Sequence, residues 1–154
     1  MFDKKKIILN HNKCFNKNDK RVIDFFETIS EILIEKVFDD NQDYRSKNIL
    51  EIASRNDILR NKIYLKSFQS NYFQTCLSEK ILVKNNKRVV SNLNDIVFKK
   101  EFFDFCFSLL SLNCSDNIPL IFKNIYTVLK NDGIFVSVFP SDDCFKEFKY
   151  FFIE

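Results

Sequence analysis

The chain has 154 residues, 45% of them hydrophobic, which is enough for one domain with its own core. Its formal net charge of +3 is spread over interspersed acidic and basic residues, so the composition argues against a nucleic-acid-binding protein. No apolar run reaches the roughly 20 residues that span a bilayer, and the N-terminus lacks a signal-peptide core, so we expect a cytoplasmic protein without a membrane span.

The reactive and metal-binding residue types are few. Five cysteines are scattered without a C-x-x-C pair, and His11 is the single histidine. These counts favour reduced thiols and predict neither a metal site nor a histidine-based catalytic triad. The runs Lys4–Lys6 and Lys84–Arg88 are interpreted as solvated faces. The chain also has 1 glycine and 19 phenylalanines, a bias that an A+T-rich coding sequence would produce in part.

The N-terminal part is predicted to be an arm followed by one long helix. Residues 1–18 are basic and show little periodicity, so we assign them to an arm and residues 19–154 to the domain. From Asp19 to Phe38, apolar residues recur at three- and four-residue intervals, which predicts an amphipathic helix. Turn-forming residues follow, and a short buried strand is predicted at 49–52.

The rest of the chain alternates between strand and helix patterns. The run 103–110, FDFCFSLL, is almost continuously apolar, as expected for a strand covered on both faces. Asp116 is the predicted cap of the next helix, Pro119 lies in its first turn, and KNDG at 130–133 is predicted to end it through a left-handed glycine. The other expected elements are a helix at 56–67, an extended run at 72–76, a short helix from Ser78, a strand at Val89 and Val90, a strand at 134–139 and a final helix from Ser141.

This order of elements predicts an α/β protein with a Rossmann-like three-layer fold, in which helices cover both faces of a mostly parallel sheet. The sequence stops after about the fifth strand, so the domain is expected to be incomplete at its C-terminus. Ligands of such sheets bind outside the carboxyl ends of the strands. The residues that directly follow each strand are therefore the candidates for a site.

Several segments resemble class I S-adenosylmethionine-dependent methyltransferases. The block 103–135, FDFCFSLLSLNCSDNIPLIFKNIYTVLKNDGIF, resembles their section from the fourth strand to the fifth, and NILEIASRND at 48–57 resembles the first strand with its glycine loop. The end segments MFDKKKIILNHNKCF and SDDCFKEFK are similar to those of malonyl acyl-carrier-protein O-methyltransferases and the related respiratory complex I assembly factors. The resemblance covers nearly the whole chain.

The resemblance implies S-adenosylmethionine as cofactor and a set of positions that bind it. Cys76 stands where relatives have an acid for both ribose hydroxyls, and Asn92 stands where an acid reads the adenine amino group; the amide keeps a carbonyl acceptor. Ala53, Arg55 and Asp57 stand where relatives have glycines; Ala53 is a mild change, whereas the Arg55 and Asp57 side chains would project into cofactor space. The implied cofactor-binding positions are Glu51, which keeps the acid of the first strand, Ala53, Arg55, Cys76 and Asn92.

Structural roles are the alternative for several of these residues. Glu51 could instead cap a neighbouring helix, and Cys76 fits an ordinary packing residue. Asp104 is expected to be a structural acid at the start of a strand. Relatives carry a histidine and a tryptophan beyond the fourth strand where this chain has Asn113 and Cys114, so no catalytic residue is assigned.

Two functions remain open. The first is methyl transfer to an unidentified acceptor, either a small molecule or an acyl-carrier or other protein, promoted by proximity. The second is a catalytically inactive relative that acts as a binding or complex-assembly protein. If the glycine loop and the ribose contact each contribute about 2 to 3 kcal/mol, losing both weakens cofactor binding by three to four orders of magnitude. That loss favours the second function.

Overall fold

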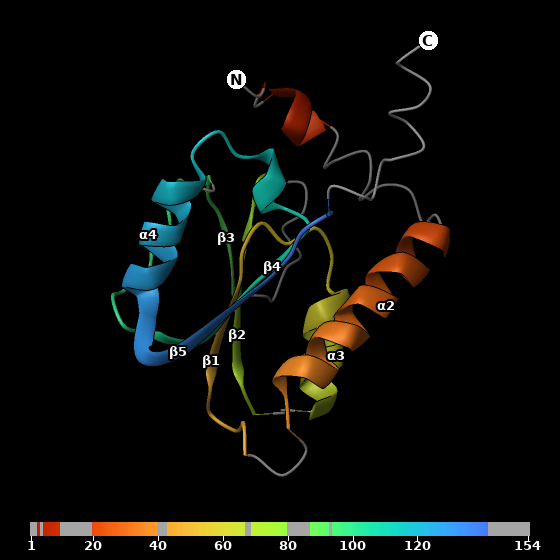
Figure 1. Ribbon diagram of the computed structural model, residues 1–154, viewed down its shortest axis with the longest axis vertical. Helices are drawn as coiled ribbons and strands as arrows, with labels where there is room; N and C mark the ends of the chain where they lie inside the picture. Colours follow the sequence, from red (N-terminus) through yellow and green to blue (C-terminus); the bar gives the residue numbers. More distant parts are fainter. Residues whose placement is uncertain are drawn as a thin grey trace.

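Five parallel strands form the centre of the protein in a computed structural model (Figure 1). The structure describes residues 3, 5–9, 20–39, 43–66, 69–79, 87–92 and 94–141. The sheet order is β3-β2-β1-β4-β5, and all four neighbouring pairs are parallel. The predicted α/β, Rossmann-like fold is therefore confirmed. The strands are β1 (Asn48–Glu51), β2 (Asn71–Cys76), β3 (Lys87–Val90), β4 (Phe103–Leu109) and β5 (Leu129–Val138).

Helices cover both faces of this sheet. On one face lie α2 (Lys20–Val37) and α3 (Ile58–Lys66), and on the other lies α4 (Ile118–Val128) (Figure 1). Side chains of a strand alternate between faces, so Ile49 packs with α2 and α3 whereas Leu50 packs with α4. No helix in the described ranges is long and apolar enough to cross a membrane.

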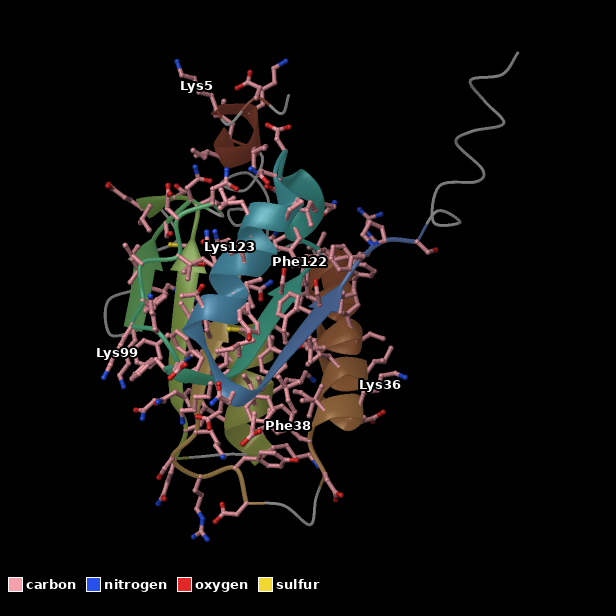
Figure 2. The ribbon with its side chains drawn as sticks, turned by 60° about the vertical axis from the view of Figure 1, so that its left-hand side comes forward. Lys5, Lys36, Phe38, Lys99, Phe122 and Lys123 are labelled. Carbon is pink, nitrogen blue, oxygen red and sulfur yellow. The ribbon has the colours of Figure 1, made fainter. Side chains whose placement is uncertain are left out.

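Phenylalanines fill both layers. Phe105 and Phe107 pack on the α2 side with stacked rings 6.0 Å apart, while Phe103 faces α4 and meets Phe73 edge to face at 5.6 Å. Phe38, directly after α2, and Phe122 on α4 come from the two different helical layers (Figure 2). The apolar character of β4 thus follows from burial on both faces, as the sequence predicted.

The boundaries of α4 differ from the prediction at both ends. Asn117, and not Asp116, caps the helix, because its side chain accepts a hydrogen bond from the Leu120 N–H at 3.1 Å. The helix ends at Val128, and KNDG lies within β5. No glycine of the described chain has a positive φ, so the left-handed stop predicted at Gly133 is wrong.

The KNDG segment bulges from the sheet. Phe103 pairs with Leu129 and Phe105 with Ile134, so a step of two residues along β4 corresponds to a step of five residues along β5. A Cβ at Gly133 would lie 2.9 Å from the carbonyl oxygen of Lys130. Glycine is therefore required here for close backbone approach, and not for a left-handed conformation.

Some predicted features lie outside the described residues. These are His11, most of the short helix predicted from Ser78, and the final helix predicted from Ser141. Residues 5–9 of the predicted arm form a helical turn. The division into an arm and a domain stays a prediction.

Candidate functional site at the carboxyl edge of the sheet

The β1–α3 turn (residues 52–57) lies at the carboxyl edge of the sheet, between the ends of β2 and β4. Its backbone continues the strand pairing, because Ile52 N–H donates to Phe107 O and Ser54 N–H to Thr75 O, each at 2.8 Å. The strand order reverses between β1 and β4, which is where open α/β sheets bind ligands. The turn therefore lies where a ligand-binding site is expected.

Ala53 holds the turn in an unusual backbone conformation. Its φ is 51°, in the left-handed region, and its N–H donates to the Thr75 hydroxyl at 2.8 Å. A non-glycine residue costs about 1 to 2 kcal/mol in that region. The turn thus has, at a position where the resemblance places glycine, a backbone conformation suited to glycine.

Arg55 bridges the turn to the end of β4. One of its Nη2 hydrogens goes to the carbonyl oxygen of Leu110, 2.9 Å away. Its Nε–H is buried and has no partner among the described residues. Leu110 also has a positive φ of 50°. The guanidinium thus lies on the carboxyl edge, where its Nε–H is available to a further acceptor.

Glu51 does not reach the surface of this edge. It is 2% exposed and accepts hydrogen bonds from the Tyr72 hydroxyl at 3.0 Å and from Gln74 Nε2 at 2.9 Å. Burial raises the pKa of Glu51 to about 7, although these hydrogen bonds oppose the increase. The first turn of α3 is instead served by Asn56, whose side chain accepts from Ile58 N–H, so Glu51 is not a helix cap.

Gln74 and Arg88 extend the contacts of Glu51 across the sheet. Gln74 Oε1 accepts from Arg88 Nε at 2.8 Å, and Arg88 forms an ion pair with Asp57. The Arg88 side chain is 1% exposed, so its interpretation as part of a solvated face is wrong. The Asp57 carboxylate is therefore directed toward Arg88 of β3. The five residues Glu51, Tyr72, Gln74, Arg88 and Asp57 are called the buried polar network below.

Sequence reasoning did not find Gln74 and Arg88. They occupy aligned positions of neighbouring strands, since Gln74 pairs with both Glu51 and Arg88 in the parallel register. The available signal was a polar residue within each strand, Gln74 in β2 and Arg88 in β3. Strand pairing alone decides that these three residues meet.

Cys76 and Asn92 lie at the ends of β2 and β3. Cys76 is fully buried, its thiol lies 3.8 Å from Val89 O, and burial raises its pKa. Asn92 is partly exposed, and the neighbouring Ser91 N–H donates to Cys76 O at 3.0 Å. The structure therefore brings Ala53, Arg55 and Asn92 to one edge, while the side chains of Glu51 and Cys76 are buried beneath it.

Hydroxyl groups fix the end of β4 against β1. Ser108 and Ser111 share a buried hydrogen bond of 2.7 Å, and Ser111 also donates to Ile52 O at 3.2 Å. Asn113 is exposed in the short 3₁₀ helix η2 (Leu112–Cys114) that follows. The loops after β1 and β4 are thus connected through buried side chains.

The residues at this edge fit an adenosyl cofactor in part. The backbone of the β1–α3 turn is close to the strand ends, Asn92 offers an amide to the adenine, and Arg55 offers a cation. Cys76 offers no carboxylate to the ribose, as the sequence indicated. Among the described residues, no group of three or more histidine, cysteine, aspartate or glutamate side chains is placed to hold a metal ion.

The topology and this edge define a Rossmann-like α/β domain. Sequence comparison gives its family: the methyltransferase domain matches residues 50–137, and the chain belongs to this family of class I methyltransferases. The family depends in general on S-adenosylmethionine. The resemblance inferred from the sequence is thereby confirmed at the level of the family.

Similar proteins support the same family. "Putative methyltransferase RP459" of Rickettsia prowazekii is 28% identical over 109 residues, which are 70% of this chain and 48% of that protein. The chain therefore spans about half the length of this curated relative.

Two solved structures share the fold. One is a chain of the Haloferax volcanii complex of the Trm112 methyltransferase activator with a methyltransferase (TM-score 0.68, 9% identity, 82% of this chain and 58% of that one). The other is geranyl diphosphate C-methyltransferase of Streptomyces coelicolor, solved with S-adenosyl-L-homocysteine (TM-score 0.63, 14% identity, 80% and 52%).

Proposed function

We propose that this protein binds S-adenosylmethionine at the carboxyl edge of its sheet and transfers the methyl group to a small-molecule or acyl-carrier-protein acceptor. The observation that carries the proposal is the β1–α3 turn at the reversal of strand order, with Ala53 at φ 51°. A left-handed residue there lets the backbone approach a ligand closely. Membership of the methyltransferase family supports the choice of cofactor.

The chain's own residues divide the binding task. The β1–α3 turn would line the amino-acid side of the cofactor, and Asn92 would accept a hydrogen bond from the adenine amino group. Bound S-adenosylmethionine supplies an electrophilic methyl group on its sulfonium. The protein then contributes mainly proximity and orientation, which supply a large part of the rate enhancement when two reactants are held together.

A second candidate is a non-catalytic binding or assembly protein. Arg55 and Asp57, at two positions where the resemblance implies glycine, are both engaged within the chain, with Leu110 O and Arg88 respectively. A turn stabilised by such contacts can keep its shape without a cofactor. The contacts therefore favour a protein that retained the fold and lost the ligand.

A thermal-shift titration with S-adenosylmethionine and S-adenosylhomocysteine separates the two candidates. Ligand at a hundred times its dissociation constant stabilises the folded state by about 2.7 kcal/mol, so we expect a saturable rise of Tm with millimolar ligand. Asn92→Ala should weaken this response, and the exposed Asn71→Ala at the opposite edge is the matched control.

A flat response of the unmodified protein at millimolar ligand would contradict cofactor binding and leave the non-catalytic candidate. If binding is seen, methyl transfer is assayed by release of S-adenosylhomocysteine with malonyl acyl-carrier protein as the acceptor. Binding without turnover on this acceptor would exclude it as the substrate.

A further inference from the structure

Arg55 has more hydrogen-bonding capacity than its surroundings use. A guanidinium carries five N–H donors, and the contact found for it is the one from Nη2 to Leu110 O at 2.9 Å. Its Nε–H is buried and meets no acceptor in the described part of the chain. Buried donors nearly always have a partner, so the unmatched Nε–H indicates that an acceptor beyond the described residues completes the arrangement.

The neighbouring arginines have acidic partners, and Arg55 differs from them. Arg88 and Arg60 both form ion pairs with Asp57, and Arg60 also lies over the ring of Tyr64 at 5.0 Å. No ion pair of Arg55 occurs among the described residues, where its acceptor is a backbone carbonyl oxygen. Within the described part of the chain, the positive charge of Arg55 at the carboxyl edge is thus not compensated by an acid.

The position of Arg55 is fixed from two sides. Its own turn contains the left-handed Ala53, and the loop that holds its acceptor contains the left-handed Leu110. A buried hydrogen bond from the Ser111 hydroxyl to Ile52 O connects the two loops. Because both loops are held in this way, the guanidinium is preorganised and loses little freedom when it binds a ligand.

We propose that Arg55 binds the carboxylate at the amino-acid end of the adenosyl cofactor. The planar fork of arginine matches a carboxylate through two parallel N–H donors, and such charge-assisted pairs are short and strong. The Arg55 side chain as a whole is only partly buried, so an incoming carboxylate can approach its exposed part. The inference rests on the proposed function. It assigns Arg55 a role in binding the cofactor, although the size of its side chain at a glycine position suggested that it would block the cofactor.

Three probes test this role without any substitution. S-adenosylhomocysteine carries the carboxylate, decarboxylated S-adenosylmethionine lacks it, and methylthioadenosine lacks the whole amino-acid end. Calorimetric titration of the unmodified protein should show S-adenosylhomocysteine binding about tenfold or more tightly than the other two. Equal affinity for all three would overturn the role of Arg55 and leave the proposed function intact. No binding of any probe would overturn both.

Substitutions then assign the effect to the residue. Arg55→Gln should weaken S-adenosylhomocysteine about tenfold or more and leave methylthioadenosine unchanged, with Arg60→Gln as the matched control that changes neither. Arg55→Gly tests whether the arginine binds the cofactor or blocks it. Weaker binding of S-adenosylhomocysteine supports the proposal, and tighter binding overturns it. Unchanged affinity in Arg55→Gln would also overturn it.

Discussion

Two carboxyl groups at opposite edges of the sheet have opposite environments. At the amino edge, Asp104 of β4 accepts hydrogen bonds from Asn48 N–H at 2.9 Å and from Lys130 Nζ at 2.9 Å, and Lys47 lies 3.4 Å away. Partial burial would raise its pKa, but the Asn48 and Lys130 contacts hold the pKa of Asp104 below its ordinary 3.8. This acid is structural, as the sequence predicted.

At the carboxyl edge, Glu51 of β1 has neutral donors as direct partners, Tyr72 and Gln74, and Arg88 acts from behind Gln74. Burial outweighs these contacts, and the pKa of Glu51 is about 7. The amino edge thus stabilises a charge near solvent, whereas the carboxyl edge holds a carboxyl group whose ionisation costs stability. Perturbed groups of this kind are common at functional sites, so the difference supports the site proposed at the carboxyl edge.

The largest expected effect is on the pH dependence of stability through Glu51. Its folded pKa of about 7 lies above the ordinary 4.5, so the folded state holds a proton that the unfolded chain releases. The free energy of unfolding therefore falls by roughly 3 kcal/mol as pH rises from about 4.5 to about 7. Glu51→Gln should remove most of this decrease, which urea unfolding at pH 5 and pH 8 would measure.

The control for this prediction is Glu35→Gln on the exposed face of α2, which should keep the pH dependence of the unmodified protein. If Glu51→Gln also keeps it, Glu51 is ionised in the folded state, and the contrast between the two edges disappears.

A smaller effect is expected at the amino edge. Asp104→Asn keeps an acceptor for Asn48 N–H but loses the charge that Lys47 and Lys130 meet, and those lysines are 41% and 44% exposed. Screening by solvent limits the cost to about 1 kcal/mol at neutral pH. The cost should vanish as pH falls through the lowered pKa of Asp104, because protonation removes the same charge. An equal cost at pH 2.5 and pH 7 would contradict this assignment.

The smallest effect compares backbone strain at the two edges. Glu101 precedes β4 with φ 52° and is exposed, so Glu101→Gly should raise the free energy of unfolding by about 0.5 to 1 kcal/mol. Ala53 has the same conformation but is 2% exposed, and glycine there would also lose a buried methyl group worth about 0.8 kcal/mol. Ala53→Gly should therefore be nearly neutral in thermal unfolding. Equal gains at both positions would show that the Ala53 methyl group contributes no packing.

Local patterns predicted most of the elements. The apolar periodicity gave α2 to within one residue at each end, and the apolar run at 103–110 gave β4. The end of α4 was mispredicted, because KNDG has strong local preferences for a turn and yet pairs with β4 around a bulge. Tertiary pairing overrode local propensity at that point.

The candidate site was predicted less completely. The family pattern placed Ala53, Arg55 and Asn92 at strand ends on one edge, and the structure has them there. It gave no indication that Glu51 is buried under Tyr72 and Gln74, since side-chain direction depends on strand register. The predicted exposure of Arg88 was wrong for the same reason. Its lysine neighbours in the sequence are typical of an exposed segment, but pairing with β2 places Arg88 beside the buried Gln74.

The alternation of helices and strands, the parallel sheet and the family follow from the amino-acid sequence, because each depends on local periodicity or on an aligned pattern of residue types. The tertiary structure decided which polar groups are buried together. Glu51, Gln74 and Arg88 are separated along the chain by 23 and 14 residues, and they meet because the parallel register aligns them. Burial at that shared position raises the pKa of Glu51, and Gln74 joins it to Arg88 by hydrogen bonds.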